Sequence, residues 1–218
     1  MQVIAGQRLV FLEMPKTASK AVVAMLKPHV SQDPGHRATE AHIGHRGFSH
    51  RWQRRLERDL GGPVETFCVM REPLERLQSW YRYRMRAKIA GGDTSTRGVD
   101  FNAFVAACIV DAPPGFARIG RQDRFLGLRP GAGPGLEGAR LGVDHVFDYR
   151  RIGVLVDFVS ERLGQRLVLP LRNVSPAPPA PVDYTLSDAV RAQVRAHLAA
   201  EFELYSLLRL RGVLHRVL

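Results

Sequence analysis

The chain has 218 residues, enough for one domain with a sizeable core, and its formal net charge is +11. Such a charge indicates an anionic ligand or surface. The arginines are scattered, however, and no RNP, zinc-finger or basic-zipper pattern is present, so nucleic acid is not the expected partner. No apolar run approaches the roughly 20 residues of a membrane span, no signal-peptide layout is present, and the two cysteines lack ligand spacing. We therefore expect a cytoplasmic protein without a membrane span.

The first predicted element is a buried strand that leads through a loop into a helix. An unbroken apolar run over 9–12 is typical of a strand covered on both faces, and Pro15 ends it. Apolar residues then recur at helical spacing from Ala21 to Leu26. A loop before a helix N-terminus presents free N–H groups and a positive dipole end, which together suit an anion. Two of the chain's four lysines and two hydroxyls lie here, in Lys16, Thr17, Ser19 and Lys20.

A polar connection rich in histidine follows over 29–49, before a predicted surface helix over 51–60. Histidine suits a catalytic base because its unperturbed pKa lies near neutrality. A polar surface loop that happens to be rich in histidine is an alternative. A metal site is another, although the spacings match no standard zinc pattern. The five candidates are His29, His36, His42, His45 and His50.

A second strand is predicted over 65–70, followed by a helix. Pro73 suits the first turn of that helix, and Glu72 and Glu75 suit its positive end. Arg71 is therefore left at the carboxyl end of a strand, where open α/β sheets bind ligands. An ordinary ion pair of Arg71 with Glu72 or Glu75 is the alternative. For Lys16 the alternative is a solvated loop lysine.

The remaining pattern predicts alternating helices and strands. We expect helices over 101–108, 122–126 and 152–163, strands over 143–147 and 167–171, and a proline-rich excursion over 174–182. A long amphipathic helix from Val190 to Tyr205 is predicted, which Gly212 could stop. Residues 1–218 are thus expected to form a single α/β domain of three layers, a central, mostly parallel sheet with helices on both faces.

Three segments of this chain resemble motifs of the sulfotransferases. Residues 15–20, Pro-Lys-Thr-Ala-Ser-Lys, are similar to the 5′-phosphosulfate loop of that family. Arg71 and Ser79, eight positions apart, are similar to its 3′-phosphate motif, and 173–176 resembles an element of the carbohydrate-type members. The resemblance implies a P-loop-like nucleotide-binding fold. It also implies 3′-phosphoadenosine 5′-phosphosulfate as donor and adenosine 3′,5′-bisphosphate as product.

The resemblance also implies residue roles. Lys16 would stabilise the leaving phosphate, and Arg71 with Ser79 would hold the 3′-phosphate. Gly44-His45 is similar to the Gly-His element that carries the base in glycan O-sulfotransferases. His45 is therefore the expected base, with His42 second, and a glycan hydroxyl is the expected acceptor. No metal is required. The backbone N–H groups that would cradle the 5′-phosphate belong to Thr17, Ala18, Ser19 and Lys20.

Two residues depart from the family pattern and keep other functions open. Ala18 stands where the family usually has glycine, which is tolerable if its φ is negative. Lys20 stands where the family usually has Ser or Thr, and it either tightens product binding or marks an altered activity. One alternative is a non-catalytic nucleotide or polyanion binder derived from a sulfotransferase. Another is a P-loop nucleotide kinase, which the absence of GxxxxGK[ST] weakens.

Overall fold

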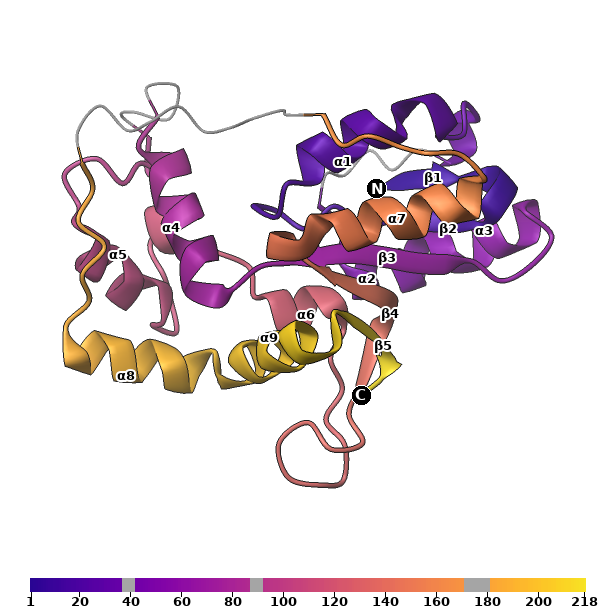
Figure 1. Cartoon of the computed structure of the whole chain (residues 1–218). Coiled ribbons are helices and arrows are strands. Elements are labelled where there is room, and N and C mark those ends of the chain that lie inside the picture. The colour runs from indigo at the N-terminus through magenta and orange to yellow at the C-terminus, as the bar shows by residue number, and fades with distance from the viewer. Residues whose placement is uncertain (37–41, 87–91, 171–180) are drawn as a thin grey trace.

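The computed structural model describes residues 1–36, 42–86, 92–170 and 181–218, and its centre is a five-stranded sheet (Figure 1). The three inner strands are parallel, and each edge strand runs antiparallel to its neighbour. The α/β class with a parallel centre is confirmed, whereas neither edge strand was predicted. In spatial order the strands are β1 (Gln2–Ile4), β2 (Leu9–Phe11), β3 (Glu65–Met70), β4 (Arg140–Asp148) and β5 (Val213–Val217).

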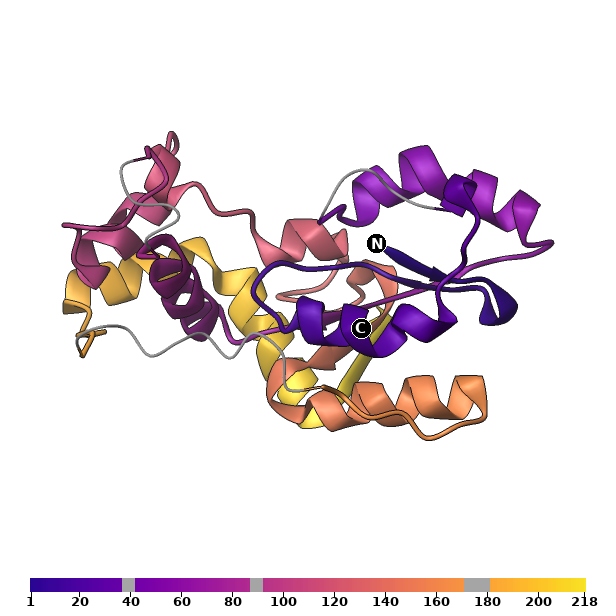
Figure 2. The ribbon, with the colours of Figure 1, turned by 90° about the horizontal axis from the view of Figure 1, so that it is seen from above.

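Helices cover both faces of the sheet, as predicted (Figures 1 and 2). α1 (Ser19–Leu26) and α7 (Ile152–Leu163) lie on one face. The opposite face is covered by α2 (His45–Phe48), α3 (Arg54–Asp59), α6 (Gln122–Leu126) and α9 (Ala199–Arg211). A π-helical turn over Ser49–Gln53 joins α2 to α3, so the helix predicted over 51–60 begins earlier than expected.

Alternation along the strands divides the core in two. On β3, Phe67 and Val69 pack beneath α1 and α7, whereas Cys68 and Met70 join the cluster beneath α6 and α9. Both sets are fully buried, so the unbroken apolar run of β3 reflects a strand covered on both sides. Burial also raises the pKa of the Cys68 thiol, which acts here as a small core residue.

A third core lies outside the sheet, in a helical lobe of α4 (Pro73–Arg84), α5 (Phe101–Cys108) and α8 (Asp188–His197). Figures 1 and 2 show this lobe to one side of the sheet, beyond the end of β3. Tyr81 stacks edge-on against Phe101, and Val194 is fully buried with them. Since α4 begins directly after β3, it connects the lobe to the carboxyl ends of the parallel strands.

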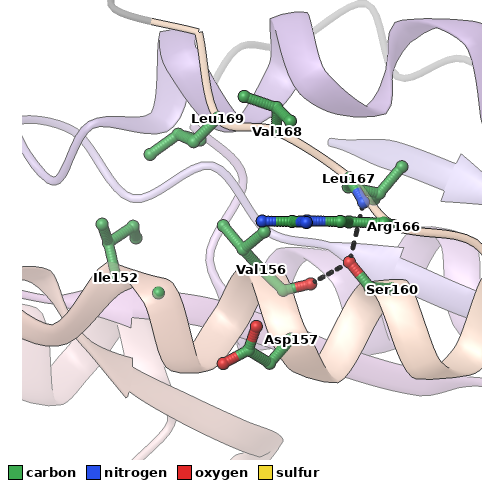
Figure 3. A pocket seen from close by; sticks show the side chains of 9 residues that line it. Ile152, Val156, Asp157, Ser160, Arg166, Leu167, Val168 and Leu169 are labelled. Atoms are coloured by element: carbon green, nitrogen blue, oxygen red, sulfur yellow. Dashed lines mark hydrogen bonds between the residues drawn. The ribbon is translucent and has the colours of Figure 1, made fainter.

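Two predicted elements differ in the structure. The long helix predicted over 190–205 is broken at Leu198 (φ −106°, ψ 22°), because Val194 packs in the helical lobe while Leu204 packs beneath the sheet. The strand predicted over 167–171 is wrong: residues 166–170 form no strand, and residue 171 lies outside the described part. Instead, the Leu167 N–H donates to Ser160 Oγ of α7 (Figure 3).

Candidate functional site

The loop between β2 and α1 turns tightly at the carboxyl end of the sheet. Lys16 (φ 70°) and Ala18 (φ 60°) both lie in the left-handed region. Thr17 is buried, and its hydroxyl donates to the Met14 carbonyl at 2.9 Å. The condition on which Ala18 was expected to be tolerated is therefore not met, because its φ is positive. Glycine is favoured at such a position since it has no Cβ to clash.

Five consecutive N–H groups of this turn lack a close acceptor among the described residues. Within the described part of the chain, none of the N–H groups of residues 16–20 donates to another residue, whereas the Ala18 carbonyl accepts from Ala21 and Val22. Positive φ values within such a run turn successive N–H groups into a concavity that suits an anion. Within the predicted cradle, Ala18 and Lys20 reach the surface, whereas Thr17 and Ser19 are buried.

α4 packs against this loop through one of its faces. Arg76 is buried and donates from Nε to the Pro15 carbonyl at 3.2 Å and from Nη2 to the Gly120 carbonyl at 2.9 Å. Ser79 and Tyr83 follow Arg76 by three and seven positions, which places all three residues on one helix face. Ser79 is buried on that face. The two sequence motifs therefore lie on neighbouring elements.

Lys16 lies in a strongly positive environment. Its Nζ is 4.2 Å from the centroid of the Tyr83 ring and 5.7 Å from that of Trp80. Burial, and then the charges of neighbouring arginines, lower the pKa of Lys16 to about 8; these arginines are Arg86, Arg71, Arg82 and Arg76. An anion bound among these cations would relieve their repulsion, so the arrangement favours an anionic ligand. Lys16 is partly buried rather than the solvated lysine of the alternative interpretation.

Arg71 lies directly after β3, at the predicted edge of the sheet. Its guanidinium carbon is 4.2 Å from the centroid of the Tyr149 ring, and its Nε is 3.5 Å from Glu75 Oε2. The ion pair of the alternative interpretation is therefore present. Arg150 also binds the Glu75 carboxylate, so two arginines share one negative charge. Arg71 is therefore not the only partner of the Glu75 carboxylate.

His45 does not lie with these residues. Its ring packs against Gly142 and Gly127, where a side chain would collide with it. Gly142 is six residues before the end of β4, which places His45 about 20 Å along the strand from the level of Arg71. Burial, then Arg129 and Arg216, lower the pKa of His45. Its Nδ1 is buried and has no hydrogen-bond partner in the described part of the chain.

His42, the second candidate, contacts the backbone that leads into the loop. Its Nδ1 is 2.7 Å from the Glu13 carbonyl, and the residue is exposed. A carbonyl only accepts, so Nδ1 carries the hydrogen and the neutral ring keeps its lone pair on Nε2. His42 thus lies beside the backbone that leads into the loop, a position that follows from tertiary packing and not from a local sequence motif.

Lys20 is exposed on the first turn of α1, and its charge acts on Glu13. Burial raises the pKa of Glu13, but a hydrogen bond from Gln2, the Met1 ammonium and the charge of Lys20 together lower it below its usual range. Lys20 therefore has one anionic neighbour already, unlike the hydroxyl that the sulfotransferase pattern has at this position.

A surface pocket of about 620 Å³ lies elsewhere, between α7 and residues 166–169 (Figure 3). Ile152, Val156 and Leu169 give it an apolar lining, and no predicted site residue takes part. Among the described residues, no group of three or more His, Cys, Asp or Glu side chains could hold a metal ion. No helix in those residues has the length and apolar character to cross a membrane.

No family model matches the chain, and the comparisons with curated proteins and with solved structures find no match. The resemblance to sulfotransferases therefore depends on the sequence motifs, of which 173–176 lies outside the described residues. Sequence reasoning missed Arg76, Tyr83, Gln122 and Tyr149. The helical spacing of 76, 79 and 83 was a signal that could have found the first two. Gln122 and Tyr149 reach the site only through tertiary packing.

Proposed function

We propose that this protein transfers a sulfuryl group from 3′-phosphoadenosine 5′-phosphosulfate to a hydroxyl acceptor, which we assign to a glycan. The observation that carries the proposal is the loop of residues 16–20, whose N–H groups have no acceptor in the described structure, beside Lys16 and Arg71. A donor with phosphates at both ends of its ribose matches two cationic positions at the ends of neighbouring parallel strands. The P-loop-like character of the fold belongs to this proposal.

In the proposed transfer, each site residue has a separate role. The donor supplies an activated sulfuryl group, whose bond to the 5′-phosphate breaks as the bond to the acceptor oxygen forms. The N–H groups of 17–20 bind the 5′-phosphate, and Lys16 neutralises charge as it develops on the leaving oxygen. Arg71 binds the 3′-phosphate with charged hydrogen bonds, beside Ser79. The positive loop and Lys16 supply the electrostatic stabilisation that such transfers need.

His42 is the base in this proposal, in place of His45. Its hydrogen bond to the Glu13 carbonyl leaves Nε2 to accept the acceptor's proton. His45 is held against β4, about 20 Å along the strand from the level of Arg71. An exposed histidine at the entrance to the loop can meet a large acceptor, whereas a ring packed on Gly142 cannot.

A non-catalytic binder of the same nucleotide is the second candidate. Lys20 favours it, because a second loop cation strengthens anion binding without any role in transfer. Preference for a 3′-phosphate separates both of these functions from a P-loop kinase, and turnover separates the enzyme from the binder.

Thermal unfolding with added nucleotides tests the proposal. Adenosine 3′,5′-bisphosphate at 100 times its Kd should stabilise the fold by about 2.7 kcal/mol. For a chain of this length that is a rise in Tm of about 5–10 °C. ATP should give less than half of that shift. Arg71→Ala should abolish the difference, whereas Arg162→Ala, which removes a surface partner of Glu65, should preserve it. Equal shifts with both nucleotides in the wild type would count against the 3′-phosphate assignment.

A further inference from the structure

A buried amide replaces the sheet partner of Arg71. The β3–β4 ladder ends at the pair Met70 and Asp148, so the backbone of Arg71 lies beyond it. Gln122, at the start of α6, satisfies both backbone hydrogen-bonding groups of Arg71. The Arg71 N–H donates to Gln122 Oε1 at 3.1 Å, and Gln122 Nε2 donates to the Arg71 carbonyl at 2.8 Å. Gln122 is fully buried, so no water substitutes for these two bonds.

Glu201 of α9 reinforces the orientation of this amide, which the donor and the acceptor of the Arg71 backbone already set. Its carboxylate accepts from Gln122 Nε2 at 3.0 Å and from the Gln122 N–H at 2.7 Å. A carboxylate cannot donate, so the nitrogen end of the amide must face Glu201 and the oxygen end must face the Arg71 N–H. Glu201 is 1% exposed, and the buried Arg76 supplies the opposite charge nearby. The set is thus a satisfied polar network within the core.

The same network reaches the other half of the anion site. Arg76 donates to the Pro15 carbonyl at the start of the loop and to the Gly120 carbonyl two residues before Gln122. Hydrogen bonds therefore run from α9 through Gln122 to the end of β3 and from Arg76 to the loop, and the opposite charges of Arg76 and Glu201 link the two sets. Their members hold main-chain atoms rather than a ligand.

We propose that Gln122 and Glu201 are positioning residues for Arg71, which fix its backbone so that its side chain meets the 3′-phosphate. This inference rests on the proposed function. It predicts that the network controls preference for a 3′-phosphate, beyond any effect on stability. The measured quantity is the ratio of the affinities for adenosine 3′,5′-bisphosphate and adenosine 5′-monophosphate, obtained by calorimetry.

The decisive variant is Gln122→Met, which keeps side-chain length and removes every hydrogen bond of the amide. We expect Arg71→Ala to lower the affinity ratio by about tenfold or more, and Gln122→Met to lower it by about fivefold. The double variant should show no further loss beyond Arg71→Ala, because both changes act on one contact. Val159→Ala, at a buried position of α7 on the opposite face of the sheet, is the control that lowers stability without touching Arg71.

Glu201→Gln provides a second measurement should Gln122→Met fail to fold. It preserves volume and replaces one of the two acceptor oxygens with a donor, so one of the two contacts with Gln122 is lost and the affinity ratio should fall by at least about twofold. An unchanged ratio in either folded variant, together with a loss of Tm like that of Val159→Ala, would overturn the inference alone. A wild type that binds the two nucleotides equally would overturn both this inference and the proposed function.

Discussion

Lys16 keeps its charge where that charge destabilises the folded chain. Its pKa falls from 10.5 to about 8 because burial and the surrounding arginines disfavour the ammonium. Below pH 8 both the folded and the unfolded chain hold the proton, so the destabilisation is fully present. Between about pH 8 and 10.5 the unfolded chain binds more protons, and the contribution of Lys16 to stability rises with pH.

Lys16→Met should therefore stabilise the protein at pH 7 while it abolishes transfer. The advantage over the wild type should shrink as pH rises above 8, since the wild-type lysine then loses its proton in the folded state. Urea unfolding of both proteins at pH 7 and at pH 9.5 measures this. A variant less stable than the wild type at pH 7 would mean that the contacts of Lys16 with Tyr83 and Trp80 outweigh its desolvation.

Replacement of each candidate base by alanine should affect turnover and stability differently. His42→Ala should lower turnover by about 10²–10⁴ and leave bisphosphate binding near the wild-type value, because the ring accepts a proton only during transfer. His45→Ala should lower the Tm, since it empties a site packed against Gly127 and Gly142, and should leave turnover within about threefold once folded. Steady-state rates with the sulfate donor compare them, and a larger loss of turnover for His45→Ala would return the role to His45.

The loop between β2 and α1 is an element whose conformation and sequence disagree at Ala18. A non-glycine residue at φ 60° costs about 1–2 kcal/mol, and glycine costs about 0.5–1 kcal/mol in lost chain entropy. Ala18→Gly should thus raise the free energy of unfolding by about 0.5–1 kcal/mol. Ala24→Gly, in the interior of α1, is the matched control and should lower it by about 1 kcal/mol. Urea unfolding measures the free energy of unfolding of both variants. A similar decrease in both would refute the strain at Ala18.

Elements with local signals could be predicted from the sequence, and those set by tertiary partners could not. β3, α4 and α7 were expected within a residue or two, because apolar periodicity, Pro73 and Gly164 mark them locally. β1 and β5 are short edge strands that exist only through pairing with β2 and β4. The break at Leu198 likewise depends on two separate cores, which no single helical period describes.

The whole molecule brings the site together from two cores. The Lys16 loop extends from the sheet, whereas Ser79 and Tyr83 belong to α4 of the helical lobe (Figure 2). The sequence motifs predicted this meeting, because both follow parallel strands that end at the same edge. The place of His45 could not be predicted, since it depends on the packing of α2 against α6 and β4. Its Gly-His pattern says nothing of that packing.

The most direct test of the account is the release of adenosine 3′,5′-bisphosphate from the sulfate donor, with and without a mixed glycan acceptor. We expect the wild type to release it faster when the acceptor is present. Lys16→Ala should bind the bisphosphate within about tenfold of the wild type and lose turnover by more than that, because Lys16 acts mainly on charge that develops during transfer. A wild type that binds the bisphosphate but releases none from the donor with any hydroxyl acceptor would contradict the proposed sulfotransferase activity. It would support the second candidate, a non-catalytic nucleotide binder.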